Sequence, residues 1–349
     1  MKRQSRQEIK VARDTVRVAE AFGFTDRLFS TPEERRSLRS LEDGLDLVEQ
    51  RITTHAQFAD PVVDGVTRYL TEAGGKRVRP MLVLLAAQLG DGVTNPVIDA
   101  AAAIEITHLA SLYHDDVMDE AATRRGVPSA HTVWGNSVAI LAGDLLFARA
   151  ANLFAPLGLE AARIQAQTFE RLCLGQMRET LGPGDADPVE HYIGVLQDKT
   201  GSLIAASAEL GVLLSNSDPA YRAPLRAYGE AIGVAFQLVD DVIDLDLTND
   251  TGKDAGNDLR AGVPTLPLLL LRQQEGDDSA LVRSLTNSSE DETFRSAVAA
   301  LADHEATAAT RREAERWQQR ALAALEPLPV GPVRRGLTKF AESVVERRA

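Results

Sequence analysis

The chain has 349 residues, 44% of them hydrophobic, which is enough for one large or two ordinary domains with a sizeable core. Its formal net charge of −13 argues against a nucleic-acid binder, which needs a surplus of Lys and Arg. The single cysteine, Cys173, excludes an intramolecular disulfide and a cysteine-based zinc site. The charged start lacks an apolar signal core, and apolar runs such as 81–87 and 266–271 are too short to span a bilayer. We therefore expect a cytoplasmic protein with no transmembrane segment.

Residues 1–40 are charge-rich and weakly patterned, and we expect an extension with short helices at most. Within it, Thr31-Pro32-Glu33-Glu34 predicts a helix start with a capping box. From residue 41 onward, apolar residues recur three or four positions apart, which indicates helices. The main predicted helices cover 61–73, 80–89, 96–119, 137–155, 159–179, 188–214, 220–246, 265–272, 290–303, 306–325 and 333–348. With no alternating strand or hairpin signal, the pattern predicts an all-α fold, a single antiparallel helical bundle over residues 41–349.

Two acidic segments, 115–119 and 240–244, share the pattern Asp-Asp-apolar-apolar-Asp at the end of an apolar helical stretch. Residues four apart share a helix face, so the first and last aspartates of each segment project together. Three carboxylates on one turn repel one another and are poorly tolerated in a core unless cations neutralise them. Oxygen-only ligands suit magnesium. We therefore predict two facing helices that hold magnesium between them.

A solvated surface cluster is the alternative interpretation of any single acidic segment. Here apolar residues precede both segments. The two stretches also resemble each other further upstream, because Glu105 and Glu230 each lie ten residues before the first aspartate. The repeated pattern favours a paired metal site.

Basic residues gather in loops of this acidic chain. The segment 74–80, Gly-Gly-Lys-Arg-Val-Arg-Pro, joins two predicted helices, and in isolation it reads as a solvated basic loop. Arg124 and Arg125 follow the first acidic segment, and 199–202 and 252–253 add lysines. Arginine suits bidentate contacts with phosphate oxygens. Acidic and basic groups together describe a site for diphosphates, whereas the sequence has no P-loop, dinucleotide fingerprint or nucleophile elbow.

In this order, the segments resemble the trans-type polyprenyl diphosphate synthases of the isoprenoid synthase family. The matching pieces, which extend over residues 41–345, are GGKRVRP (74–80), HLASLYHDDVMDEAATRRG (108–126), GDLL (143–146), KTGSL (199–203), FQLVDDVIDL (236–245) and TGKDAGNDLRAGVPTLPL (251–268). The resemblance implies a helical bundle of the isoprenoid synthase type with a central apolar cavity, magnesium as cofactor, and a homodimer. It also implies the head-to-tail (1′–4) condensation of isopentenyl diphosphate with an allylic diphosphate.

The resemblance further implies roles for individual residues. The principal magnesium ligands are Asp115, Asp119 and Asp240, helped directly or through water by Asp116, Asp241 and Asp244. The allylic diphosphate is assigned to Arg124, Lys199 and Lys253, isopentenyl diphosphate to Lys76, Arg79, His108 and Arg125, and the surroundings of the carbocation to Thr200 and Gln237. One position departs from the family, because Val263 stands where many relatives carry a lysine.

His108 has a plainer alternative, since a histidine beside apolar neighbours is usually a core residue. It lies seven residues before Asp115, two helical turns away, and so shares that face. Together with the resemblance, this spacing favours a phosphate contact.

The length of the product depends on the residues one helical turn before Asp115. These are Ala110 and Ser111, both small, whereas bulky aromatics here stop growth early in the family. Small residues leave room for a deep tunnel, so we predict a product of about seven to nine isoprene units, of the kind used for quinone side chains. The floor then comes from another helix, with Phe147 or Phe154 as candidates. The alternative is a farnesyl or geranylgeranyl diphosphate synthase.

Other classes fit the sequence less well. A class I terpene cyclase normally replaces the second aspartate motif with an Asn-Ser-Glu type motif and lacks GGKRVRP. An HD-type phosphohydrolase, suggested by His114-Asp115, needs further histidine ligands that are not evident. A non-catalytic partner subunit commonly loses its acidic motifs, and both are intact here.

Overall fold

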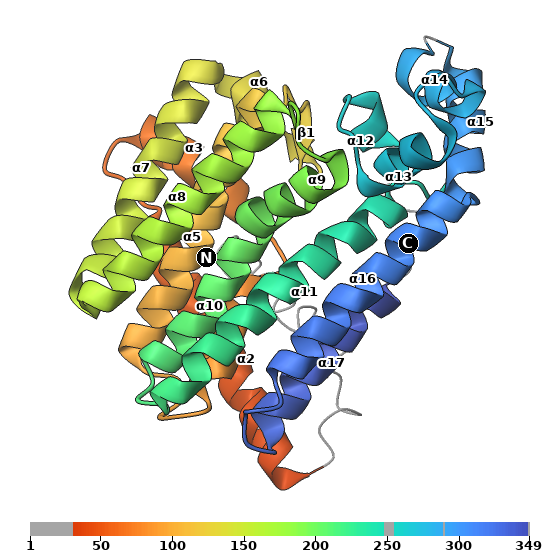
Figure 1. Ribbon diagram of the computed structural model, residues 1–349. Coiled ribbons are helices and arrows are strands. Elements are labelled where there is room, and N and C mark those ends of the chain that lie inside the picture. The colour runs from red at the N-terminus through yellow and green to blue at the C-terminus, as the bar shows by residue number, and fades with distance from the viewer. Residues whose placement is uncertain (1–30, 248–254, 289, 348–349) are drawn as a thin grey trace. The chain divides into compact units, whose positions relative to one another are not determined.

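The computed structural model describes residues 31–247, 255–288 and 290–347, and most of these residues are helical (Figure 1). The predicted all-α class is therefore confirmed. The chain divides into two compact units, each made of several stretches. The first unit contains Met1–Thr168, described from residue 31, with Leu203–Arg226 and Pro327–Lys339, and the second contains Phe169–Ser202, Ala227–Glu326 and Phe340–Ala349.

The first unit is built around one long helix. Its elements are α2 (Pro32–His55), α3 (Pro61–Glu72), α4 (Val78–Ala87), α5 (Asn95–Met118), β1 (Thr123–Arg124), β2 (Val127–Pro128), α6 (Ala130–Trp134), α7 (Asn136–Phe154), η2 (Ala155–Leu157) and η4 (Pro219–Tyr221). Helices α2, α4 and α7 pack against α5, in which residues 100–107 are all buried. Helix α4 is buried from Pro80 to Ala87, because its sequence is apolar on every side.

The second unit contains shorter helices beside the long α16. Its elements are α9 (Pro188–Leu196), a π-helical turn η3 (Gln197–Gly201), α12 (Asn257–Arg260), α13 (Leu266–Glu275), α14 (Ala280–Asn287), α15 (Asp291–Ala302) and α16 (Glu305–Ala324). Helix α13 packs against α9 and α16, and α14 packs against α15 around a core that includes Leu268, Leu271 and Val298. Helices α8 (Leu159–Leu181), α10 (Ser202–Leu213), α11 (Arg222–Ile243) and α17 (Pro332–Glu346) contribute residues to both units.

Several helices begin with a polar cap followed by proline. The side chains of Thr31, Asp60 and Asp187 accept backbone N–H groups of the first turn, and a proline follows each of them. The cap satisfies donors that have no partner within the helix, and proline lacks the N–H that would otherwise stay unpaired. The capping box predicted at Thr31 is confirmed. Helix α2 then continues through residues 40 and 41, where the sequence analysis placed the start of the domain.

The prediction that the chain has no hairpin is wrong. Strands β1 and β2 pair antiparallel, with Thr123 opposite Pro128 and Arg124 opposite Val127. The turn residues Arg125 and Gly126 both have positive φ, of 53° and 77°. This geometry is that of a tight hairpin turn, but such turns favour Asn, Asp or Gly first, and two-residue strands are too short to show alternation. The helices α6, α12 and α14 were also missed, because they are too short to show a clear helical repeat of apolar residues.

One apolar helix is longer than the apolar runs on which the expectation of no transmembrane segment was based. Within the described residues, the stretch Asn136–Leu157, which is mainly α7, is long and apolar enough to cross a membrane by length and composition. It also carries Asp144 and Arg149, and it packs along α5 in the first unit. A helix buried against protein passes the same test of composition, so we interpret its apolar surface as one that packs against protein.

The close contact between α10 and α4 generates a stability prediction. A Cβ atom on Gly211 would lie 2.4 Å from the carbonyl oxygen of Val83 and 2.7 Å from the Cβ of Ala86. Gly211→Ala therefore forces two packed helices apart, and we expect the free energy of unfolding to fall by about 1–3 kcal/mol although alanine favours a helix. Denaturant unfolding followed by circular dichroism measures the change.

The matched control is Gly65→Ala in α3. A Cβ atom there meets nothing within 4 Å, so the helix propensity of alanine acts alone and should stabilise by about 0.5–1 kcal/mol. Equal effects at positions 211 and 65 would contradict the close packing of α10 on α4.

Candidate active site

The first acidic segment stands at the C-terminal end of α5. The helix ends at Met118, and the N–H of Asp119 donates to the carbonyl of Asp115 at 2.8 Å. Asp115 is half-buried and Asp119 is exposed, whereas Asp116 is only 1% exposed. The C-terminal end of a helix carries partial negative charge, so carboxylates are unfavourable there unless cations accompany them.

Asp116 points inward and has only part of its hydrogen bonding satisfied. The Nε–H of Arg124 donates to Oδ1 of Asp116 at 2.6 Å, and the hairpin β1–β2 brings that guanidinium into place. Burial raises the pKa of Asp116, against the lowering effect of Arg124. Its buried Oδ2 has no hydrogen-bond partner among the described residues. Arg124, predicted to hold the allylic diphosphate, thus binds the acidic segment in this state.

His108 lies on α5, and arginines from other segments of the chain surround it. Burial lowers the pKa of His108 well below its usual value, and the positive charges of Arg79, Arg125, Arg77 and Arg124 lower it further. Of the residues predicted to bind isopentenyl diphosphate, three therefore lie close together: Arg79, His108 and Arg125. His108 is neutral at pH 7, so one ring nitrogen donates and the other accepts.

The other members of this basic group differ in their surroundings. The guanidinium of Arg125 donates to the carbonyl of Leu70 at 2.9 Å and to that of Gly74, both at the C-terminal end of α3. Lys76 is exposed at the same loop. Arg79 is half-buried, its Nε has no partner among the described residues, and burial lowers its pKa. A half-buried guanidinium whose Nε–H has no partner among the described residues is suited to bind an anion.

The second acidic segment repeats the design of the first. Helix α11 ends at Ile243, and the N–H of Asp244 donates to the carbonyl of Asp240 at 2.9 Å. The middle aspartate is again the buried one, because Asp241 is 1% exposed. The hydroxyl of Tyr192 donates to its Oδ2 at 2.6 Å, while its Oδ1 has no partner among the described residues. Burial raises the pKa of Asp241 to about 7, although the Tyr192 hydrogen bond lowers it.

Sequence reasoning missed two partners of this segment. The Nη1 of Arg347 donates to Oδ1 of Asp240 at 2.9 Å, and its guanidinium lies 4.7 Å from the ring centroid of Phe236. Tyr192 lies 49 positions before Asp241, and Arg347 lies 107 positions after Asp240. No pattern in the sequence links residues so far apart.

The last aspartate of this segment has a backbone partner, because the N–H of Asp258 donates to Oδ2 of Asp244 at 3.1 Å.

The predicted helix 188–214 is interrupted where the chemistry is expected. Lys199 and Thr200 lie in the π-helical turn η3, between α9 and α10. Extra residues in such a turn are frequent at functional sites. Lys199 forms an ion pair with Glu179. Gln237 is half-buried one turn before Asp241, and Lys253 lies outside the described residues.

The two positions predicted to set the length of the product differ in burial. Ala110 is fully buried, and a Cβ atom on Gly143 of α7 would lie 3.1 Å from the carbonyl oxygen of Ala110. Ser111 is half-buried, and its hydroxyl donates to the carbonyl of His108 at 2.9 Å. Phe147 packs edge-on against His114 with ring centroids 5.5 Å apart, and Phe154 is buried in the core.

The residues fit a divalent ion by their chemistry. Within the described parts of the chain, no three acidic or histidine side chains already converge on a point. Magnesium usually binds through one or two carboxylates together with substrate phosphates and waters, so such a cluster is not required. The buried oxygens Asp116 Oδ2 and Asp241 Oδ1, which lack hydrogen-bond partners among the described residues, would gain from a nearby cation.

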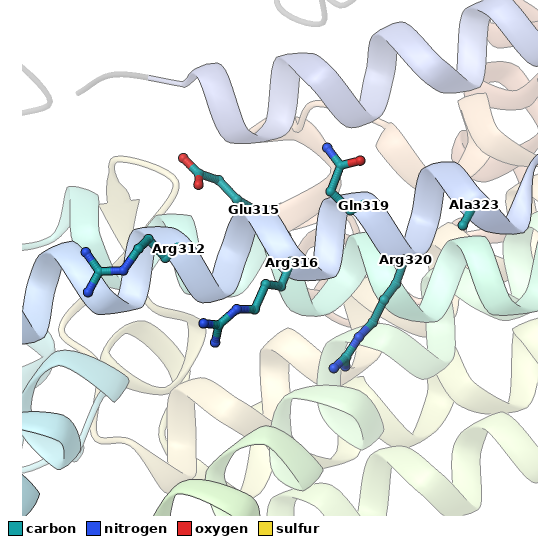
Figure 2. A pocket seen from close by; sticks show the side chains of 6 residues that line it. All are labelled: Arg312, Glu315, Arg316, Gln319, Arg320 and Ala323. Atoms are coloured by element: carbon teal, nitrogen blue, oxygen red, sulfur yellow. The ribbon is translucent and has the colours of Figure 1, made fainter.

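A surface hollow on α16 lies apart from this chemistry in the sequence. It is lined by Arg312, Glu315, Arg316, Gln319, Arg320 and Ala323 (Figure 2). None of the residues predicted for the site belongs to it. Arg312 pairs with Glu305 and Arg316 with Glu313, as on an ordinary solvated helix face.

The chain is similar to known proteins in both sequence and fold. Residues 60–301 match the family model described as polyprenyl synthetase. The chain is 43% identical over 309 residues to a nonaprenyl diphosphate synthase of Mycobacterium tuberculosis, covering 87% of this chain and 92% of the relative. It resembles the structure of a polyprenyl synthase from Caulobacter crescentus, complexed with calcium and isoprenyl diphosphate, with TM-score 0.82, 33% identity, and coverage of 90% and 98%. A geranylgeranyl pyrophosphate synthase from Corynebacterium glutamicum is similar with TM-score 0.79, 39% identity, and coverage of 91% and 98%.

The fold is thus that of the all-α isoprenoid synthases, and the resemblance seen in the sequence is confirmed. The chain belongs to the polyprenyl synthetase family, and it is a prenyltransferase.

The neutral His108 generates a prediction for pH. Its pKa in the folded state lies below the unfolded value of about 6.5, so the unfolded chain binds a proton that the folded chain excludes. The free energy of unfolding must therefore fall as the pH drops below about 6.5, by up to about 1.4 kcal/mol per pH unit for this group. His108→Gln removes that proton, and its stability should decline less steeply between about pH 7.5 and 5.5. Parallel profiles of the wild type and the variant in denaturant unfolding would contradict a lowered pKa of His108 in the folded chain.

Proposed function

We propose that the chain condenses isopentenyl diphosphate head to tail with an allylic diphosphate and releases an all-trans polyprenyl diphosphate, with magnesium as the metal. The observation that carries the proposal is the repeated construction of the two acidic segments. Each ends a long helix, buries its middle carboxylate with one oxygen that lacks a hydrogen-bond partner among the described residues, and leaves its outer carboxylates more accessible. Such carboxylates need cations, and a diphosphate needs the same cations.

In this proposal the two acidic segments hold magnesium for the allylic diphosphate. Their members are Asp115, Asp116 and Asp119 in the first, and Asp240, Asp241 and Asp244 in the second. Bound divalent ions supply the positive charge that makes diphosphate a good leaving group. Arg124, Lys199 and Lys253 add fixed positive charge for the same group, which stabilises charge that develops as the allylic carbon–oxygen bond breaks.

The second substrate has its own basic pocket. Lys76, Arg79, His108 and Arg125 bind the diphosphate of isopentenyl diphosphate, and the arginines around His108 support this assignment. The bound substrate presents its double bond to the allylic carbocation and forms the new carbon–carbon bond. The resulting cation then loses a proton to the diphosphate released from the allylic carbon. Thr200 and Gln237 place oxygen dipoles near the carbocation, and the exclusion of water prevents its capture.

We propose a long product, of about seven to nine isoprene units, because Ala110 and Ser111, five and four residues before Asp115, are both small. The similarity to a nonaprenyl diphosphate synthase supports this length. A shorter product is the alternative, supported by the similarity to a geranylgeranyl pyrophosphate synthase.

We propose a homodimer formed through α7. Val138, Leu141 and Leu145 lie on one face of this helix and are 38%, 60% and 38% exposed in the single chain. An exposed apolar stripe of this kind is typical of a protein interface. The single cysteine supports a reducing, cytoplasmic location for that dimer. The intact acidic segments disfavour the roles of terpene cyclase and of non-catalytic partner subunit.

The activity is tested by incubating the purified protein with magnesium, farnesyl diphosphate and labelled isopentenyl diphosphate. We expect elongated linear diphosphates, none when the metal is chelated, and a fall in kcat of at least about a hundredfold in Asp115→Asn, because leaving-group stabilisation is the main catalytic effect. Cyclic hydrocarbons would indicate a cyclase. Absence of turnover without a second polypeptide would contradict an independent synthase.

The length of the product is tested at the two small residues. Ala110→Phe and Ser111→Phe should each shorten the dominant product, as seen by chromatography after dephosphorylation, because an aromatic ring fills the tunnel one turn before Asp115. Ala110 is buried, so its variant is also checked for folding, and half-buried Ser111 offers the milder change. Wild-type products of twenty carbons or fewer would contradict the long-chain proposal.

A further inference from the structure

Two glutamates occupy equivalent places on the helices that carry the acidic segments. Glu105 in α5 and Glu230 in α11 each lie ten residues before the first aspartate. Ten residues of α-helix are about 15 Å, so neither carboxylate reaches the end of the helix where the aspartates lie. The proposed reaction leaves this repeat without a role. In the structure, each glutamate binds an arginine from a different segment of its own unit.

Glu105 anchors the loop between α3 and α4. The Nη1 of Arg77 donates to Oε1 of Glu105 at 3.0 Å, and its Nε and Nη2 donate to the two oxygens of Glu49 at 2.8 Å each. The side chains of Arg77 and Glu105 are 7% and 2% exposed. Arg77 also has φ of 48°, a left-handed conformation that a residue with a side chain keeps only when its surroundings fix it. Because Arg77 is the N-cap residue of α4, this anchor fixes both the end of the loop, which carries Lys76, and the first turn of α4, which carries Arg79.

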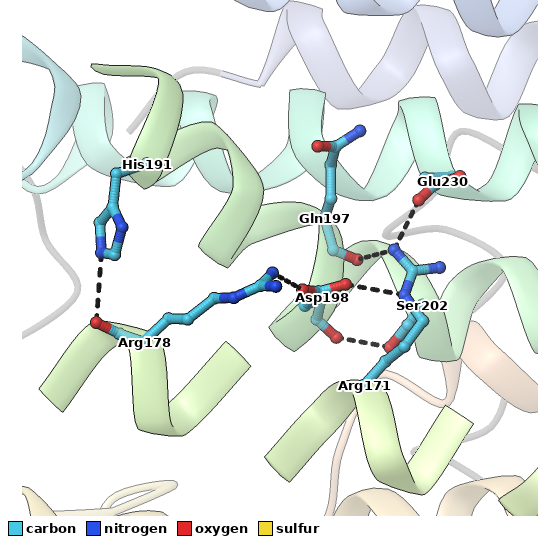
Figure 3. A network of polar contacts seen from close by, with 7 residues as sticks. All are labelled: Arg171, Arg178, His191, Gln197, Asp198, Ser202 and Glu230. Carbon is cyan, nitrogen blue, oxygen red and sulfur yellow. Dashed lines mark hydrogen bonds and ion pairs between the residues drawn. The ribbon is translucent and has the colours of Figure 1, made fainter. Parts of the chain in front are cut away.

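Glu230 anchors the π-helical turn η3. The Nη2 of Arg171 in α8 donates to Oε1 of Glu230 at 2.6 Å, and its Nε donates to Oδ1 of Asp198 at 2.7 Å (Figure 3). The same Nη2 donates to the carbonyl of Gln197 at 3.2 Å, and Arg178 binds the other oxygen of Asp198. Asp198 directly precedes Lys199 and Thr200 in the turn. The arginine therefore ties the turn to α8 and α11.

Two glycines let that turn lie close to both helices. A Cβ atom on Gly175 of α8 would lie 2.9 Å from the backbone nitrogen of Lys199. A Cβ atom on Gly201 would lie 3.1 Å from the carbonyl oxygen of Glu230. This close approach brings the turn within reach of Arg171, whose contacts with Asp198, Gln197 and Glu230 then orient the segment that carries Lys199.

We propose that Glu105 and Glu230 are positioning residues that serve different substrates. Glu105, through Arg77, sets the loop for isopentenyl diphosphate, and Glu230, through Arg171 and Asp198, sets the turn for the allylic diphosphate. The inference rests on the proposed function, which assigns Lys76 and Arg79 to the first substrate and Lys199 and Thr200 to the second. A basic group displaced by about one ångström loses much of its contact with a phosphate, so the loss of one anchor weakens one substrate.

A crossed experiment tests the division of labour. Glu105→Gln and Glu230→Gln keep the size of the side chain and remove its charge. We expect Glu105→Gln to raise the KM for isopentenyl diphosphate about tenfold and to change that for the allylic diphosphate less than about twofold. Glu230→Gln should show the reverse pattern. A general loss of structure would change both KM values or lower kcat alone. Equal changes in the KM values for the two substrates, or no change in either, would therefore overturn the inference.

The matched control is Glu160→Gln. Glu160 in α8 binds Arg163 and Arg222, and neither arginine contacts a basic segment of the proposed site in the described structure. This variant loses ion pairs in the same way and should leave both KM values unchanged, which shows that charge removal alone is not responsible. The thermal midpoint of every variant is measured alongside. If Glu105→Gln does not fold, Glu49→Gln loosens the same arginine at a more exposed carboxylate.

Direct binding separates this inference from the proposed reaction. Isothermal titration of isopentenyl diphosphate into the wild type and Glu105→Gln needs no turnover. A wild type that binds this ligand but does not add it to an allylic diphosphate contradicts the proposed function, whereas an affinity that falls about tenfold in Glu105→Gln still supports the anchor. An unchanged affinity in the variant overturns the anchor even where turnover is normal.

Discussion

Negative charge at the C-terminal ends of two helices is the constraint on which the rest of the site depends. Each end carries three aspartates, and the middle one of each set is buried. The helix dipole opposes a carboxylate there by only about 0.3–1 kcal/mol. Burial matters more, because a rise in the pKa of Asp241 from 3.8 to about 7 corresponds to about 4 kcal/mol against its ionised form. The arrangement persists because neighbouring groups supply part of the missing solvation.

Those neighbours explain much of the local architecture. The guanidinium of Arg124, which lies in a hairpin of two-residue strands, forms an ion pair with Asp116. The hydroxyl of Tyr192 donates a hydrogen bond to Asp241, and Arg347, the last described residue, forms an ion pair with Asp240. Each partner satisfies one oxygen, and in both buried carboxylates a second oxygen stays without a partner among the described residues. Such half-satisfied groups are costly in a structural core and useful where a cation is bound during function.

The parts of the site that follow from helical periodicity were predictable. The spacing of apolar residues gave the long helices, and the ordered motifs gave the acidic and basic segments. The repeat of Glu105 and Glu230 was also visible in the sequence, but its meaning required Arg77 and Arg171. The partners of the second acidic segment, Tyr192 and Arg347, are distant in the sequence, and no local pattern connects them with the aspartates. The π-helical turn and the hairpin were missed because one adds a residue within a continuous helical pattern and the other has strands too short to alternate.

The central claim is that both acidic segments bind divalent metal for one diphosphate. The most direct measurement is anomalous diffraction from crystals grown with manganese, a replacement for magnesium, and inorganic pyrophosphate. The account predicts manganese peaks within about 2.5 Å of carboxylate oxygens of Asp115 and of Asp240, each also bound to pyrophosphate. Pyrophosphate bound with no metal peak beside either aspartate would contradict it.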